Sequence, residues 1–152
     1  MPVGRSSSPT HQQGAKAEDA AAVFMQEQGY QLVAQNFNTR LGEIDLIVQH
    51  SDRLQLVFVE VRQRKANALV SAAESITLAK QRKLMRAAQV FLQQHPQYRH
   101  HDCRFDVIAY TSTLTSASRK KSNVLQTDHT AGQFALEQPI HMEWIQAAFY
   151  AA

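Results

Sequence analysis

Apolar residues dominate two neighbouring segments in the first half of the chain. Residues 42–49 (GEIDLIVQ) and 54–63 (LQLVFVEVRQ) are rich in Ile, Leu, Val and Phe, and the polar sequence HSDR separates them. Short apolar runs of this kind, bounded by turn residues, are typical of buried strands. The pattern therefore predicts a β-hairpin over residues 42–63.

Two further segments alternate apolar with polar residues, as half-buried strands do. They are YQLVAQNF (30–37) and RFDVIAYT (104–111). In the second, Asp106 stands between apolar neighbours, and we expect it to pair with Arg104 or with an adjacent strand as a structural residue.

Three segments have helical spacing. In GAKAEDAAAVFMQEQG (14–29) the residues Ala17, Ala21, Phe24 and Gln28 share one stripe, and Gly29 suits the end of a helix. Residues 71–94 form the strongest helical pattern, which Pro96 ends. The last segment, IHMEWIQAAFY, predicts a short C-terminal helix with Ile140, Trp144 and Phe149 roughly on one side.

The rest of the chain lacks such periods. Residues 1–12 are predicted to be a disordered tail, and residues 112 to about 138, rich in Ser, Thr and Lys, a flexible loop. A length of 152 residues suits one domain, here 13–152. The predicted class is α/β with the order α-β-β-β-α-β, a mixed central sheet and an added C-terminal helix.

The hairpin brings acidic residues together. If its turn is centred between Asp52 and Arg53, the numbers of paired residues sum to 105. One face is then apolar and includes the pair Ile44–Val61. The other face places Ile47 opposite Phe58, Asp45 opposite Glu60, and Glu43 opposite Arg62. Directly opposed carboxylates repel, so the pair Asp45–Glu60 needs a neutralising partner.

Three kinds of neutralisation are open. A divalent cation such as Mg²⁺ binds one or two carboxylates and keeps water for its other positions. Alternatively, the two groups share a proton, which raises one pKa, or they form a structural cluster of ion pairs with Arg62 or another base. The position of the cluster, at the end of an otherwise apolar element, favours the metal.

Composition narrows the class of protein. The formal net charge of +3 and the pI of about 9.2 are compatible with a polyanionic partner. Cys103 is the only cysteine, and no apolar run approaches the roughly 20 residues that span a bilayer. The N-terminus lacks the apolar segment of a secretory signal. We therefore expect a cytoplasmic protein with no membrane partner.

Together the motifs resemble a known family. The sequences AED in the first helix, GEIDLIV, VFVEVRQR, SITLAKQRKL, RFDVIAY and the terminal EWIQAAF are similar to those of the YraN-like family of small bacterial predicted endonucleases. The resemblance covers residues 14–110 and returns at 143–149. It implies a restriction-endonuclease-like core, similar to that of Holliday-junction resolvases, and a divalent-metal-dependent nuclease acting on DNA, with branched or processed DNA as candidate substrates.

The resemblance also implies roles for residues. Asp45 and Glu60 would bind Mg²⁺ or Mn²⁺ with help from the Val61 carbonyl, and Glu18 would bind a second ion or orient a metal-bound water. Arg62 stands where such sites carry a lysine and would stabilise charge on the phosphoryl oxygens, with Glu43 holding it in place. Arginine stays protonated and cannot act as a general base. Lys80 could replace the lysine if its helix turns it inward.

Basic residues near the cluster are candidate nucleic-acid contacts, namely Arg64, Lys65, Lys80 and Lys83. DNA is expected rather than RNA, and the junction-cutting proteins of the superfamily suggest a homodimer. Two alternatives remain open: a catalytically impaired nucleic-acid-binding module with a nuclease-like fold, and a protein-interaction domain whose acidic cluster is structural.

Overall fold

The predicted hairpin forms the centre of the molecule, with the predicted register. In the computed structural model, Leu46 pairs with Val59, Ile47 with Phe58 and Val48 with Val57, so partner numbers sum to 105. The structure describes residues 9–65, 67–112 and 140–150. Except for Ser112, the predicted loop 112–138 lies outside them, as do residues 1–8 of the predicted tail.

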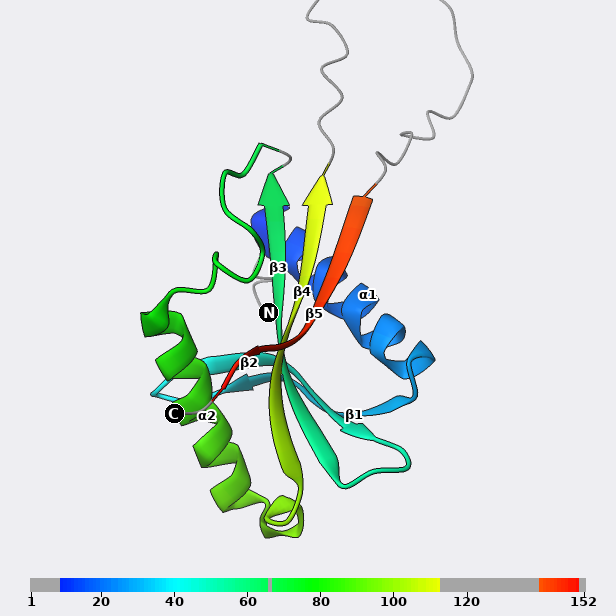
Figure 1. The fold of residues 1–152 in the computed structure, drawn as a ribbon, viewed down its shortest axis with the longest axis vertical. Helices are drawn as coiled ribbons and strands as arrows, with labels where there is room; N and C mark the ends of the chain where they lie inside the picture. The colour runs from blue at the N-terminus through cyan, green and yellow to red at the C-terminus, as the bar shows by residue number, and fades with distance from the viewer. Residues whose placement is uncertain (1–8, 66, 113–139, 151–152) are drawn as a thin grey trace, which may run out of the picture.

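Two α-helices, one short 3-10 helix and five strands, the hairpin strands included, make up the described part of the chain (Figure 1). Their bounds are α1 (Pro9–Glu27), β1 (Tyr30–Asn38), β2 (Glu43–His50), β3 (Gln55–Lys65), α2 (Leu78–Gln94), the short 3-10 helix η1 (Pro96–Tyr98), β4 (Asp102–Ser112) and β5 (Ile140–Phe149). The sheet order is β1-β2-β3-β4-β5, and only the β3–β4 pair is parallel. The predicted α/β class with a mixed sheet and the α-β-β-β-α-β order are confirmed.

One helix covers each face of the sheet (Figure 1). On one face, Ala21 and Met25 of α1 pack against Leu46, Val57 and other residues of the central strands. On the opposite face, Leu84, Ala87 and Phe91 of α2 pack against Phe58 and its neighbours. Strands covered on both faces are apolar on both, which is why residues 44–48 and 56–59 are buried without interruption. In the described part of the chain, neither helix is long and apolar enough to cross a membrane.

The predicted C-terminal helix is wrong: residues 140–149 form the edge strand β5, antiparallel to β4. Trp144 packs on the α1 side of the sheet and Phe149 on the α2 side, so they do not share a helical stripe. Between them Ala147 has a φ of 49° and the register shifts. Such a bulge breaks the period of two by which a strand is recognised in sequence.

Both helices begin elsewhere than predicted. Helix α1 begins at Pro9, inside the predicted tail, and proline is well suited to a first helical turn. Helix α2 begins at Leu78 and not at Ser71, because the side chain of Thr77 caps it by accepting the Lys80 N–H at 3.2 Å. Residues 71–76 form a separate turn, in which Ser71 and Glu74 each bind the other's backbone N–H through their side chains.

Candidate metal and nucleic-acid site

The candidate site lies where β2 and β3 separate. Their ladder is described as far as the pair Leu46–Val59. Beyond it, the Val61 N–H donates to Oδ2 of Asp45 at 2.7 Å. The carboxylate of Asp45 thus satisfies a backbone donor that the end of the ladder leaves free, and Asp45 is held with 8% of its surface exposed.

The strand alternation breaks at Asp45, which corrects one detail of the predicted hairpin. Ile44 was expected to share a face with Val61, yet Ile44 packs on the α2 side and Val61 on the α1 side. In β1, Gln35 pairs with Leu46 and Phe37 with Ile44. Asn36 between them has a φ of 52°, in the left-handed region that asparagine tolerates. Both strands therefore depart from regular alternation here, β1 at Asn36 and β2 at Asp45, while the register shift of the β1–β2 pair lies between Leu32 and Ala34.

Glu60 is the most buried carboxylate of the site. It is 5% exposed, and its Oε1 lies 3.4 Å from Nζ of Lys80 and 3.7 Å from Nε of Arg62. Its Oε2 is buried and has no hydrogen-bond partner among the described residues. Burial and the negative charge of Asp45 raise the pKa of Glu60 to about 7, although the charges of Lys80 and Arg62 act in the opposite direction.

Asp45 and Glu60 influence each other directly. Burial raises the pKa of Asp45, while the Val61 N–H and the charge of Lys80 lower it, as does a hydrogen bond to Glu60. Each carboxyl group therefore lies within electrostatic reach of the other.

Glu18 lies on α1 near the same cluster. Burial raises its pKa first, and the charge of Asp45 raises it further, while a hydrogen bond to Asn36 lowers it. Glu18 is thus within electrostatic reach of Asp45. Even so, no three His, Cys, Asp or Glu side chains in the described ranges form a group that could hold a metal ion. The role of Glu18 as a metal ligand stays a prediction.

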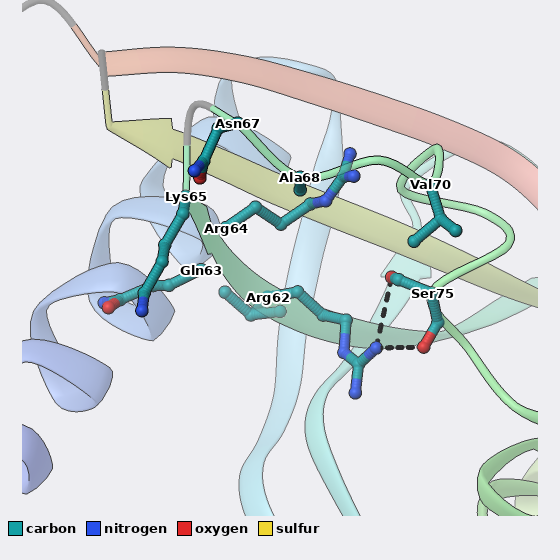
Figure 2. Close-up of a pocket in the computed structure, with 9 residues that line it drawn as sticks. Arg62, Gln63, Arg64, Lys65, Asn67, Ala68, Val70 and Ser75 are labelled. Carbon is teal, nitrogen blue, oxygen red and sulfur yellow. Dashed lines mark hydrogen bonds between the residues drawn. The ribbon is translucent and has the colours of Figure 1, made fainter. Parts of the chain in front are cut away.

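Arg62 and Glu43 are not partners in the described contacts. The Nη1 of Arg62 donates to the backbone oxygen of Ser75 and, at 3.1 Å, to the Ser75 hydroxyl (Figure 2). Glu43 is exposed and lies beside Lys80 and Lys83. Arg62 is therefore held by the 71–76 turn, and the expectation that Glu43 positions it is not met.

Lys80 was expected to replace the usual lysine only if its helix turns it inward, and it does point inward, toward Glu60. The sequence pattern, with a helix that starts near Ser71, left open whether Lys80 turns inward or lies on the surface. The missed signal is Thr77, an N-cap residue type three positions before Lys80. A helix that starts after this cap brings Lys80 into the first turn.

The donor set fits a hard divalent cation. Two buried carboxyl groups interact, and one oxygen of Glu60 has no hydrogen-bond partner among the described residues. Mg²⁺ is commonly held by one or two carboxylates plus water, so a third acidic ligand is not required. Asp45 and Glu60 are the residues that could hold it, and the Val61 carbonyl and Glu18 stay predicted contributors.

Each of the two cationic neighbours of Glu60 also lines a pocket. The loop pocket, of about 520 Å³, lies between the end of β3 and residues 67–75, and Arg62, Arg64 and Lys65 line it. The turn pocket, of about 310 Å³, lies between the turn 38–43 and α2, and Lys80 and Lys83 line it. All four predicted nucleic-acid contacts therefore line one of these two pockets. Arg40, which also lines the turn pocket, was missed although it stands in the turn after a predicted strand.

Comparison with known proteins places the chain among similar proteins of unassigned activity. The model of the uncharacterised protein family UPF0102 matches residues 17–110. A UPF0102 protein of Psychrobacter cryohalolentis is 43% identical over 145 residues, which are 93% of this chain and 82% of that protein. A UPF0102 protein of Acinetobacter baylyi is 36% identical over 139 residues, which are 91% of this chain and 90% of that protein.

Proposed function

The chain belongs to the uncharacterised protein family UPF0102, as the resemblance of its motifs predicted, and we propose that it is a divalent-metal-dependent nuclease that hydrolyses phosphodiester bonds in DNA. The observation that carries the proposal is the buried carboxylate pair Asp45–Glu60. One Glu60 oxygen has no partner among the described residues, and the other lies beside Arg62 and Lys80, which line two pockets. The expected cytoplasmic location gives access to DNA.

Asp45 and Glu60 would hold Mg²⁺ or Mn²⁺. When bound, the ion would polarise the phosphate and lower the pKa of a bound water. The chain prepares this site by keeping both carboxyl groups buried, which strengthens their interaction with any cation that enters. Val61 fixes the direction of Asp45 through its N–H.

Sites of this kind usually carry one lysine. Here Lys80 would stabilise the negative charge of the phosphoryl group, and Arg62 would hold the neighbouring turn in place. Lys80 ends in a compact ammonium group beside Glu60, suited to the developing negative charge of a phosphoryl group. The guanidinium group of Arg62 is tied to Ser75 and so keeps the 71–76 turn against the site. Arg62 also adds positive charge next to Glu60.

The substrate class follows from the charge around the cluster. Lysine and arginine side chains line the pockets on both sides of Glu60, and the whole chain carries a formal net charge of +3. A polyanionic strand whose phosphates meet these cations would lie across the carboxylates. Protein or neutral substrates would leave this positive charge unused.

The test is incubation of the purified protein with labelled DNA in the presence of Mg²⁺ or Mn²⁺. The substrates are a duplex, a duplex with an overhang, a single strand and a four-way junction, with a matching RNA for comparison. Cleavage that disappears in Asp45→Asn and Glu60→Gln, but persists in Asp52→Asn at the exposed hairpin turn, supports the proposal. Cleavage that both site variants retain assigns it to another site or to a contaminant.

A second candidate is a nucleic-acid-binding module without turnover. It is favoured by the absence, among the described side chains, of a three-residue metal-ligand group, and by arginine at position 62. Salt-sensitive DNA binding with no metal-dependent cleavage in wild type or in Arg62→Lys would select this candidate.

A further inference from the structure

Three cationic side chains, Arg62, Arg64 and Lys65, line the loop pocket, and only Arg62 among them forms an ion pair with the carboxylate pair. In Figure 2, Arg62 and Arg64 extend from β3 toward the loop residues Ser75 and Val70, while Gln63 and Lys65 extend to the other side of the strand. This alternation is that of a regular strand. It puts two guanidinium groups on the side of β3 that the loop covers.

None of the described residues that line this pocket is acidic. Arg62 is shared with Glu60 at 3.7 Å, but no acidic side chain in the described ranges forms an ion pair with Arg64. The fork of an arginine matches phosphate oxygens in geometry. Arg64 is therefore available for an anion that comes from outside the chain.

The volume of the pocket and the residues of its walls indicate which class of anion it could bind. A volume of about 520 Å³ lies within the range of small-molecule sites and exceeds the needs of one inorganic phosphate. Ala68 and Val70 supply apolar wall beside the arginines. A sugar ring attached to a phosphate meets both kinds of surface.

We propose that the loop pocket binds a backbone nucleotide of the substrate strand, with its phosphate on Arg64 and its sugar against Ala68 and Val70. The inference rests on the proposed function for its orientation: Arg62 joins the pocket to Glu60, so the bound nucleotide flanks the phosphodiester that is cut. Arg64 lies four positions after Glu60, or roughly 13 Å along the strand.

The test is DNA binding in the absence of divalent metal, so that its outcome does not depend on cleavage. Fluorescence anisotropy measures the affinity for a labelled duplex over a series of salt concentrations. Arg64→Ala is expected to weaken binding about five- to tenfold and to reduce the slope of log K against log salt by about 0.9, the value for one lost phosphate contact. Arg64→Lys keeps the charge and is expected to keep the slope.

Arg53→Ala is the matched control. Arg53 is exposed just before β3, at the end of the strand opposite to Arg64 and roughly 30 Å from it. The same loss of one charge there is expected to leave the slope within about 0.2 of wild type. Equal slopes for Arg64→Ala, Arg53→Ala and wild type would overturn the proposal.

Two further arms separate related outcomes. If a deoxynucleoside monophosphate binds through Arg64 while Arg64→Ala leaves oligonucleotide binding unchanged, the pocket is a free-nucleotide site and the proposal fails. Asp45→Asn and Glu60→Gln, tested alongside, are expected to keep the Arg64-dependent slope even if no cleavage is found, which separates this inference from the proposed activity. In the wild type, a shift of the Arg64 Nε–H resonance on adding DNA reports the contact without any substitution.

Discussion

The ammonium nitrogen of Lys80 lies 3.4 Å from Oε1 of Glu60, so a residue of the first turn of α2 meets a residue of the central strand β3. This contact crosses from the helix layer to the sheet. It gives the buried carboxylate of Glu60 a positive neighbour whose charge lowers its pKa, against the larger effect of burial. Helix α2 thus contributes to the site as well as to the core.

Replacement of Lys80 by Met is expected to reduce DNA cleavage by about 100-fold, because a preorganised positive charge is removed next to the reacting phosphate. The same substitution at Lys83, which is exposed on the same helix, is expected to cost less than tenfold. Rates are compared at saturating DNA, so that weaker binding does not contribute. Equal losses in the two variants would show that Lys80 acts as a general surface charge.

The stability of the protein is expected to fall as the pH rises from about 4.5 to about 7. The pKa of Glu60 is raised from 4.5 to about 7, so the folded protein holds a proton that the unfolded chain releases in this range. The raised pKa of Asp45 acts in the same direction. Glu60 alone contributes at most roughly 3 kcal/mol. Urea unfolding at several pH values measures the slope.

Glu60→Gln is the variant that isolates this effect, since glutamine does not titrate. It is expected to gain stability relative to wild type as the pH rises to 8, and to lose part of the pH slope. Glu27→Gln, an exposed carboxylate at the end of α1, is the control. A slope that Glu60→Gln leaves unchanged would mean that Glu60 titrates as an ordinary surface residue.

Mn²⁺ or Mg²⁺ is expected to stabilise the protein most at pH 8, where both carboxyl groups are ionised. A ligand that binds only the folded state raises stability by about 2.7 kcal/mol at 100 times its dissociation constant. Thermal melting with and without metal measures this. Asp45→Asn and Glu60→Gln are expected to abolish the gain, while Asp52→Asn keeps it. The same gain in all variants would place the ion elsewhere.

The sequence predicts the hairpin well because two buried faces exclude a slip of one residue, and the register centred on the four-residue turn is the one observed. Partner numbers that sum to 105 hold from Gln49–Leu56 to Leu46–Val59. The prediction fails beyond Leu46, since the left-handed Asn36 of the neighbouring strand is not visible in the alternation of β2. The acidic pair was still found, because Asp45 and Glu60 are charges in otherwise apolar runs.

Strand β5 could not be recognised locally because its irregularity depends on a distant residue. The Ala147 N–H donates to Oδ1 of Asp106 at 3.0 Å, where the register of β4 and β5 shifts. Asp106 lies 41 residues earlier in the chain. Its predicted structural pairing is confirmed on both counts, with Arg104 and with the neighbouring strand.

Asp106→Ala is expected to destabilise the protein by about 3–5 kcal/mol. The carboxylate accepts two hydrogen bonds from Arg104 at 2.8 Å, one from Trp144 Nε1 and one from Ala147, and it is 1% exposed. Its removal leaves a partly buried guanidinium group without its counter-charge. Chemical unfolding checks the loss, and Asp102→Ala, exposed on the same strand, is expected to change stability by less than about 0.5 kcal/mol.

Gly42→Ala tests whether the turn 38–43 must lie against α2. A Cβ atom at Gly42 would stand 2.6 Å from the backbone oxygen of Lys83, closer than real contacts allow, so the turn has to move away from the helix. We expect a loss of about 1–3 kcal/mol in stability. Because Lys80 and Glu43 line the same turn pocket, DNA cleavage is expected to fall as well.

Gly14→Ala provides the opposite case in the same protein. Gly14 lies within α1, and a Cβ atom there meets nothing within 4 Å, so alanine is expected to stabilise the helix by up to about 1 kcal/mol. Thermal and urea unfolding of the two variants measure effects of opposite sign.

If Gly42→Ala were as stable as wild type, the close approach of the turn to Lys83 would not be needed, and the walls of the turn pocket would have to be placed differently. A stable Gly42→Ala that cleaves DNA more slowly would instead show that the approach serves the site and not the fold.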